Sequence, residues 1–114
     1  MKRRSVIYEA WDVVVVPFPF SERPGTKRRP ALVLSRSSFN KAGHSVLAMI
    51  TTRARKPWPA DVEVANLEQA GLHIPCIVRL KMFTLDNRLL IKRIGSLSPA
   101  DRRDVASSLR TALV

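Results

Sequence analysis

The sequence predicts a mainly β protein, a small and mostly antiparallel barrel with one α-helix packed on it at the C-terminus. Short apolar and β-branched runs recur up to about residue 97, separated by turn-forming residues. A sustained helical period appears only in the last segment of the chain. Strands do not alternate with long helical segments, and this disfavours a doubly wound parallel sheet.

The expected strands follow one another with short connections. The β-branched run Val13–Val16 ends at Pro17 and predicts a buried strand. The Pro-Gly pair at 24–25 marks a turn. Further strands are expected at Pro30–Ser35, at Ser45–Thr51, at Asp61–Val64, and within residues 74–85 and 89–97. One helical turn is expected at residues 67–71, where Gly71 would stop it.

The C-terminal segment carries the signals of a helix start. Ser98 suits the N-cap, Pro99 the first helical position, and Asp101 follows the cap by three residues. One helical face is expected to hold the apolar residues that recur every four positions, Val105, Leu109 and Leu113. About fourteen helical residues would span roughly 21 Å and cover one side of a small barrel.

Length and composition predict a single domain over residues 1–114. Hydrophobic residues make up 46% of the chain, which is enough for a packed interior and excludes a disordered basic tail. No apolar run approaches the roughly 18–20 residues that span a bilayer. Glu9 and Asp12 break the apolar stretch that follows the basic start, which argues against a signal peptide. We therefore expect a cytoplasmic protein with no membrane partner.

The charge is strongly positive, with 20 Lys and Arg against 9 Asp and Glu and a formal net charge of +11. Basic residues gather in two short segments of the first half of the chain. The first segment contains Arg23, Lys27, Arg28 and Arg29, and the second contains Arg53, Arg55 and Lys56. Such clusters on a small body predict contact with a nucleic acid.

Several classes of chemistry lack their motifs. The four glycines form neither a P-loop nor a dinucleotide-binding fingerprint. The lone Cys76 has no disulfide partner, and His44 and His73 do not have the spacing of a zinc site. The few carboxylates do not resemble an acidic Mg²⁺ cluster. We therefore expect no metal site and no cofactor.

Some polar and aromatic residues have structural interpretations at this stage. His73 suits an ordinary turn, and Asp61 and Glu63 suit a solvated strand face. Trp58 lies between two prolines, beside the second basic segment. It has three open interpretations: it stacks on a base, closes the barrel end, or serves a dimer interface.

A basic protein without a metal can still cleave RNA, because RNA carries its own nucleophile, the 2′-OH beside the scissile phosphate. The protein has only to orient this hydroxyl, move its proton and stabilise the charge that develops on the phosphate. An arginine can bind two phosphate oxygens at once, and a threonine hydroxyl can orient one of them.

Several segments together resemble one known family. They are residues 12–20 (DVVVVPFPF), 27–35 (KRRPALVLS), 39–40 (FN), 48–52 (AMITT), 77–79 (IVR) and 84–86 (TLD), followed by the helix from Pro99. In order and spacing they resemble the MazF/PemK family of toxin endoribonucleases. The resemblance runs from about Asp12 to the C-terminus.

The resemblance implies a compact SH3-like barrel that forms a homodimer. It also implies metal-independent, sequence-selective cleavage of single-stranded RNA, often mRNA, leaving a 2′,3′-cyclic phosphate and a 5′-hydroxyl. A cognate acidic antitoxin would block the RNA groove. The family's arginine before proline matches Arg29, its threonine matches Thr51, and a second arginine matches Arg79.

The general base is the least determined part of this site. Lys81 stands where some family members have an aspartate, and Glu22 is the nearest counterpart of a family glutamate. Glu22 is therefore the first candidate, and catalysis by Arg29 and Thr51 without a dedicated carboxylate is the second. Thr52 competes with Thr51, because only one of two consecutive strand residues should face the groove.

The remaining basic residues are expected to bind RNA: Arg23, Lys27, Arg28, Arg53, Arg55, Lys56 and Lys81. Two other functions stay open. One is a non-catalytic nucleic-acid-binding barrel that uses the same basic loops. The other is a CcdB-like toxin directed at a topoisomerase, against which the basic loops and the Arg29–Thr51 pair argue.

Overall fold

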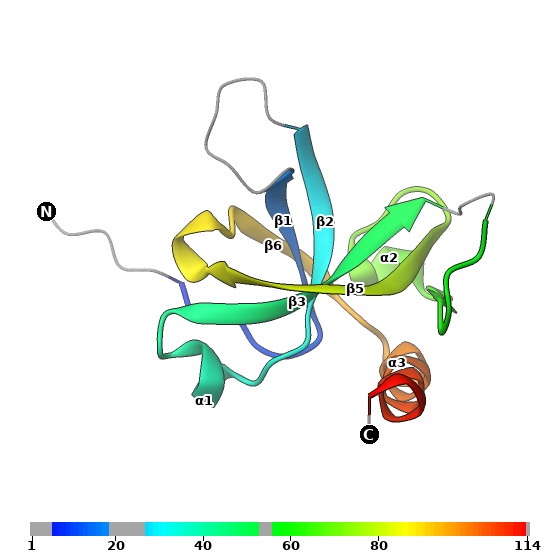
Figure 1. The fold of residues 1–114 in the computed structure, drawn as a ribbon. Coiled ribbons are helices and arrows are strands. Elements are labelled where there is room, and N and C mark those ends of the chain that lie inside the picture. Colours follow the sequence, from blue (N-terminus) through cyan, green and yellow to red (C-terminus); the bar gives the residue numbers. More distant parts are fainter. Residues whose placement is uncertain (1–5, 19–26, 53–55, 114) are drawn as a thin grey trace, which may run out of the picture.

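The computed structural model describes residues 6–18, 27–52 and 56–113. Within them a curled antiparallel sheet forms a half-barrel, with a long helix at the C-terminus (Figure 1). The strands are β1 (Asp12–Phe18), β2 (Lys27–Val33), β3 (His44–Thr52), β4 (Val62–Glu63), β5 (Cys76–Asp86) and β6 (Lys92–Ser96). They are ordered β4-β5-β3-β2-β1-β6. The predicted fold class, mainly β with a C-terminal helix, is confirmed.

The short helical elements agree in part with the sequence prediction. Helix α2 (Leu67–Ala70) forms and ends at Gly71, as expected. Helix α1 (Ser37–Asn40) and the 3₁₀ turn η1 (Asn87–Leu89) were not predicted, because a single turn carries no apolar period. The turn η1 occupies the start of the segment in which the last strand was expected, so β6 begins only at Lys92.

Helix α3 (Pro99–Ala112) has the predicted start and the predicted length of 14 residues. The backbone N–H of Asp101 donates to the Ser98 hydroxyl at 3.2 Å, which confirms the N-cap. Val105 is fully buried on the predicted face. Leu113 lies beyond the helix and is 57% exposed, so its place on the apolar face was wrong.

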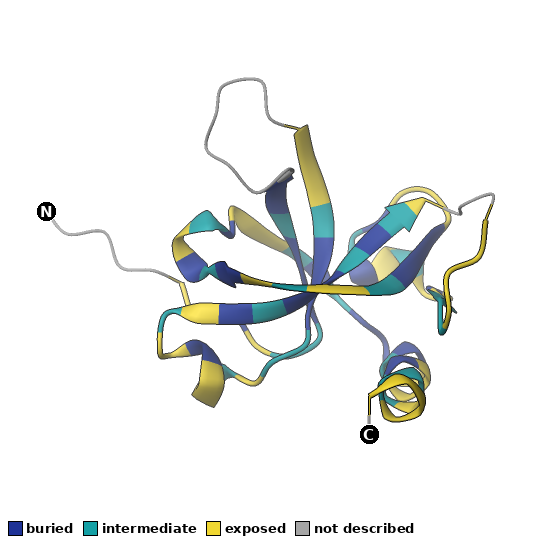
Figure 2. Cartoon of the chain, in the orientation of Figure 1, coloured by how far each residue is buried: buried dark blue, intermediate teal, exposed yellow. Residues whose placement is uncertain are grey.

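The sheet buries apolar side chains on both faces, in two separate clusters. Figure 2 marks the buried positions along its strands. The cluster under α3 includes Val13, Leu32, Ile50, Val78 and Val105. The cluster on the other face includes Tyr8, Val14, Val33, Leu47 and Leu85. Strand β3 contributes alternate residues to the two clusters, as the period of two requires.

Two glycines let α2 touch β6. Gly71 has a left-handed φ of +74°, and a Cβ on it would overlap the carbonyl of Ile94. A Cβ on Gly95 would overlap the backbone of Ala70. This close backbone contact fixes the start of the segment that leads from α2 into β5. No helix in the described part of the chain is long and apolar enough to cross a membrane.

Candidate functional site

A pocket of about 400 Å³ opens where β2 and β3 part. The two strands pair from Val33 and Leu47 to Ala31 and Met49, where their ladder ends. Both continue as strands, β2 back to Lys27 and β3 on to Thr52, and they diverge beyond the ladder (Figure 1). The residues around the pocket include Arg28, Arg29, Thr51, Thr52, His73 and Cys76. The opening therefore lies at the end of the barrel where the first basic segment enters β2.

Arg29 and Thr51, the two residues expected at the centre of the site, both line this pocket. They also share one face of the sheet. Ala31 and Met49 are opposite each other in the ladder, and each of the two candidates lies two residues further along its own strand. Side chains two residues apart point to the same face. Arg29 is exposed and Thr51 is half-buried, so a ligand can reach both.

Two more residues that line the pocket add to the expected set. Thr52 lines it as well as Thr51, although the two side chains point to opposite faces of the sheet. His73, interpreted from sequence as an ordinary turn residue, also lines the pocket. No spacing pattern could reveal it, because the α2–β5 connection brings it there.

Cys76 lines the same pocket. It is buried, and burial raises the pKa of its thiol above the ordinary value of 9.0. The thiol is therefore uncharged at neutral pH. A neutral, buried thiol is a poor nucleophile, so Cys76 serves as packing.

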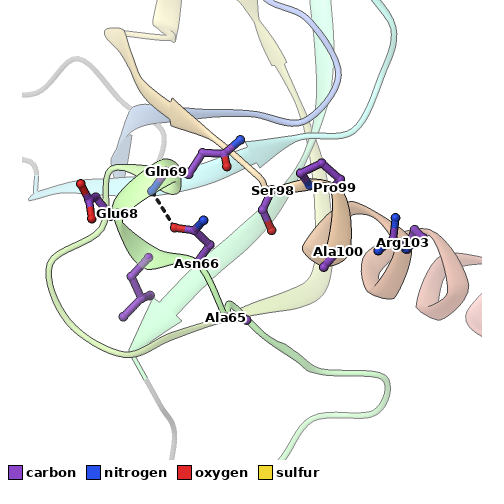
Figure 3. Close-up of a pocket in the computed structure, with 9 residues that line it drawn as sticks. Ala65, Asn66, Glu68, Gln69, Ser98, Pro99, Ala100 and Arg103 are labelled. Carbon is purple, nitrogen blue, oxygen red and sulfur yellow. Dashed lines mark hydrogen bonds between the residues drawn. The ribbon is translucent and has the colours of Figure 1, made fainter.

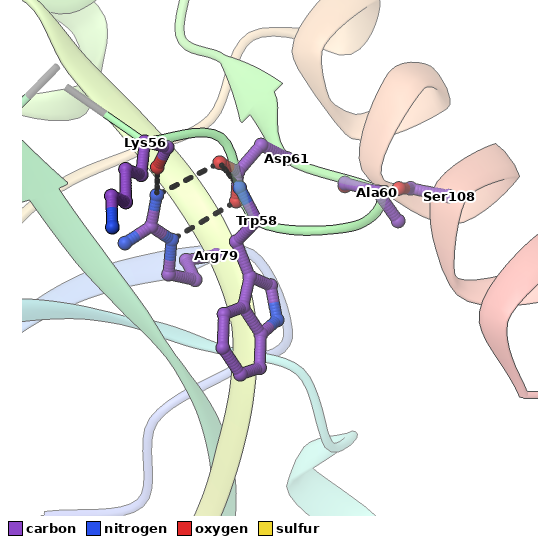
Figure 4. A network of polar contacts seen from close by, with 6 residues as sticks. All are labelled: Lys56, Trp58, Ala60, Asp61, Arg79 and Ser108. Atoms are coloured by element: carbon purple, nitrogen blue, oxygen red, sulfur yellow. Dashed lines mark hydrogen bonds and ion pairs between the residues drawn. The ribbon is translucent and has the colours of Figure 1, made fainter. Parts of the chain in front are cut away.

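Arg79 lies on β5 opposite Met49, and Thr51 is opposite Ile77. Arg79 is thus a diagonal neighbour of Thr51 on the same face, with Cβ atoms about 7 Å apart in regular geometry. Its guanidinium turns away toward Asp61, through Nε to Oδ1 at 3.2 Å and Nη2 to Oδ2 at 2.9 Å (Figure 4). It does not belong to the lining of the 400 Å³ pocket.

The expectation of a solvated Asp61 was wrong. The side chains of Asp61 and Arg79 are only 15% and 14% exposed. Burial raises the pKa of the Asp61 carboxyl, but hydrogen bonds from Arg79 and from the Trp58 backbone N–H outweigh it, so the pKa lies below 3.8. The hydrogen bond to Asp61 in turn raises the pKa of Arg79 above its ordinary value. Asp61 and Arg79 are therefore both charged at neutral pH and form an ion pair.

Other predicted RNA-binding residues surround this face. Lys27, Arg28, Lys56 and Lys81 are all exposed. The Lys81 ammonium lies 4.5 Å from the centroid of the Trp58 ring, and the Arg79 guanidinium carbon lies 6.0 Å from it. Four predicted site residues lie outside the described part of the chain: Glu22, Arg23, Arg53 and Arg55.

A larger and more open pocket of about 760 Å³ lies between α2 and the start of α3 (Figure 3). Asn66 caps α2 there by accepting a hydrogen bond from the Gln69 backbone N–H at 3.0 Å. The rest of the lining includes Ser98, Pro99 and Arg103, and none of the predicted site residues. The described residues hold no group of three or more His, Cys, Asp or Glu side chains that could bind a metal. The smaller pocket is therefore the candidate site.

Residues 9–113 match the family model described as PemK-like, MazF-like toxin of type II toxin–antitoxin system. The chain belongs to this family. The family match and the fold agree with the resemblance that the sequence motifs carry. No curated protein sequence matches the chain.

Solved structures with this family's fold cover nearly the whole chain. A MazE–MazF complex from Deinococcus radiodurans is 25% identical, with a TM-score of 0.74 over 95% of this chain and 97% of the other. An endoribonuclease from a mycobacterial species is 19% identical, with a TM-score of 0.75 over 97% and 95%. A mycobacterial endoribonuclease in complex with its cognate antitoxin is 21% identical, with a TM-score of 0.73 over 93% and 94%. The last two show likeness of fold alone.

Proposed function

We propose that this chain is a metal-independent, sequence-selective endoribonuclease, the toxin of a toxin–antitoxin pair. The observation that carries the proposal is the meeting of Arg29 and Thr51 in one pocket, on one face of the sheet, in a chain of the MazF/PemK family. Membership of this toxin family supports the same activity. The substrate is single-stranded RNA, including mRNA.

In the proposed reaction, the 2′-oxygen attacks the adjacent phosphorus and the bond from phosphorus to the 5′-oxygen breaks. The products are a 2′,3′-cyclic phosphate and a 5′-hydroxyl. The Arg29 guanidinium binds the non-bridging oxygens with its planar fork and stabilises the charge that develops on them. The Thr51 hydroxyl orients the phosphate. Lys27 and Arg28, exposed at the start of β2, bind the neighbouring backbone.

The proton of the 2′-hydroxyl has two candidate acceptors. Glu22 is the candidate from sequence, and His73 is the imidazole that the fold brings to the pocket. Imidazole is a common general base near neutral pH. The variants Glu22→Gln and His73→Gln separate the two. The true base is the residue whose variant loses cleavage while keeping its affinity for an uncleavable RNA.

The partners follow from the same proposal. We infer a cognate acidic antitoxin, for which the MazE–MazF relative gives support, and a homodimer acting in the cytoplasm. A net charge of +11 suits both an acidic protein and a polyanionic substrate.

The test is RNA cleavage in EDTA by the wild type, by Arg29→Ala and by a matched control, Arg110→Ala. Arg110 is an exposed arginine in the last turn of α3. We expect cuts that end in 2′,3′-cyclic phosphate for the wild type and the control, and a loss of roughly 10²–10³-fold in rate for Arg29→Ala. Tight, salt-sensitive binding without any cleavage would instead support the binding barrel. A block of gyrase activity that needs no RNA would support the CcdB-like alternative.

A further inference from the structure

We propose that Trp58 is a platform on which one RNA base stacks, and that Asp61 is the residue that positions it. The inference rests on the proposed function, because it assigns a base-binding subsite to the same RNA-cleaving face. It selects one of the three interpretations that the sequence left open for Trp58.

Trp58 is not a packing residue of either core. The residue is 41% exposed, and it belongs to neither apolar cluster of the described residues. An exposed indole on a strongly basic protein is a common platform for bases in single-stranded RNA. The interpretation in which Trp58 closes the barrel end is therefore the weakest of the three.

The loop that carries Trp58 is held in one conformation from several sides (Figure 4). The Trp58 backbone N–H donates to Asp61 Oδ2 at 2.8 Å, and the Asp61 N–H donates back to the Trp58 carbonyl at 3.1 Å. Arg79 binds the same carboxylate and also donates to the Lys56 carbonyl at 3.2 Å. Asp61 thus joins the loop to β5.

A second anchor lies at the other end of the loop. The Ser108 hydroxyl of α3 donates to the Ala60 carbonyl. Ala60 has a left-handed φ of +64°, a conformation that costs free energy for a residue with a Cβ. A loop held in this way presents the indole already ordered, which reduces the entropy lost when a base binds.

The charges around the indole match a nucleotide. Strand β5 has a bulge at Leu80 and Lys81, because Ala48 pairs with Met82 while Met49 pairs with Arg79. The Lys81 ammonium lies over the ring, 4.5 Å from its centroid. A base that displaces this ammonium from the face of the indole would bring its own phosphate within reach of it.

The platform also lies on the reacting side of the sheet. Arg79, whose guanidinium carbon is 6.0 Å from the ring centroid, shares the face of Thr51 as its diagonal neighbour. The base on Trp58 would therefore belong to a nucleotide close to the scissile phosphate. We infer that this subsite contributes to the choice of cleavage sequence.

The first test uses fluorescence. The chain has two tryptophans, so Trp11→Phe leaves Trp58 as the sole indole. Titration with a short 2′-O-methyl oligoribonucleotide, which cannot be cleaved, should quench this fluorescence. An oligonucleotide that binds without any change in Trp58 emission would overturn the proposal.

The second test uses kinetics in the wild-type background and does not depend on the Trp11 variant. Trp58→Ala should raise KM about 5- to 150-fold, the loss expected for one stacked base, with kcat within about twofold. Trp58→Phe should restore most of the affinity. Phe39→Ala removes another exposed aromatic, on α1 away from the groove, and should leave KM unchanged. An unchanged KM in Trp58→Ala would overturn the platform.

Asp61→Asn tests the positioning role. It should raise KM and weaken the quenching of Trp58 while kcat stays close to the wild-type value. Loss of dimers, or of affinity for an acidic antitoxin alone, in Trp58→Ala at unchanged KM would assign the indole to a protein interface and overturn the proposal. A wild type that binds RNA and quenches without cutting it would reject the nuclease function while supporting the platform.

Discussion

The two ends of β3 use polar side chains in opposite ways. At its start, Ser45 lies in a buried network of neutral groups, in which its hydroxyl donates to Asn87 Oδ1 at 2.6 Å. Asn87 in turn donates to the Asn40 carbonyl at 2.7 Å. At the other end, Thr51 opens into a pocket beside the exposed Arg29.

The polar groups at the start of β3 contribute to stability, whereas those at its far end are available for chemistry. The polar groups around the start of β3 are buried and paired, and Asn40 also donates to the Tyr8 carbonyl at 2.9 Å. Every buried polar side-chain atom in the described part of the chain has a hydrogen-bond partner. Groups paired in this way hold the α1 and η1 turns against the sheet. At the far end the ladder stops early, so side chains reach solvent and a ligand. Changes at the two ends should therefore have different consequences.

Among changes at the two ends of β3, the largest effect is expected on activity, from Thr51→Val. Removing the hydroxyl while keeping the shape should lower kcat by roughly 10²-fold, because an interaction with the developing charge is lost. The melting temperature should stay near that of the wild type. Cleavage of a fluorogenic RNA measures the first and thermal unfolding the second.

Thr52→Val is the matched control for that prediction. Thr52 lines the same pocket from the alternate strand position, and it lies on the sheet face opposite to Arg29. Its substitution should cost less than about threefold in rate. Equal losses of cleavage rate in Thr51→Val and Thr52→Val would show that the sheet face on which a threonine lies does not determine which one takes part in catalysis.

The next effect is on stability, from Asn87→Leu. This change leaves the Ser45 hydroxyl buried without its acceptor and removes one of the two hydrogen bonds to the Asn40 carbonyl, which keeps the Gly43 N–H. It should cost about 2 kcal/mol of unfolding free energy. Urea unfolding measures it, with Ser38→Ala, an exposed serine of α1, as the control. The folded fraction should still cleave RNA at the wild-type rate. A loss of activity without destabilisation would contradict the division between the two ends.

A smaller effect is expected on the stability of the protein at acidic pH. The pKa of Asp61 is lower in the folded chain than its ordinary value of 3.8. Its contribution to stability is therefore complete above that ordinary value and is lost as the pH falls through the lower, folded one. The difference in urea midpoint between the wild type and Asp61→Asn should be constant from pH 7 to 5 and shrink below pH 3.8. A difference in urea midpoint that grows as the pH falls would contradict the assignment of Asp61 and Arg79 as a stabilising ion pair.

The sequence predicted the strands and α3 well because their patterns are local. The β-branched run before Pro17 and the Ser-Pro start at residue 98 each determine an element without help from distant residues. For the centre of the pocket, the sequence predicted the two residues that the family motifs contain, Arg29 and Thr51. His73 and the Asp61–Arg79 pair were not predicted, because tertiary folding brings together residues whose spacing carries no period.

The smallest effect is expected at a pair that resembles Asp61–Arg79 in geometry but not in surroundings. Arg88 also binds a carboxylate with two nitrogens, Nε to Asp86 Oδ1 at 3.1 Å and Nη2 to Oδ2 at 2.8 Å. Its side chain is 77% exposed, however, where water competes for both partners. Hydrogen bonds from Arg88 lower the pKa of Asp86 to about 2.

Arg88→Ala should therefore move the melting temperature by less than roughly 2 °C at pH 7. The pKa of Asp86 should rise toward its ordinary value, because the side-chain hydrogen bonds that lower it most are removed. An NMR titration of the Asp86 carboxyl measures this rise, and thermal unfolding measures the stability. Arg79→Ala should destabilise more, since it leaves the half-buried Asp61 carboxylate without its charged partner. Equal losses of stability in Arg88→Ala and Arg79→Ala would mean that the two-nitrogen geometry, rather than burial, determines how much these ion pairs stabilise the fold.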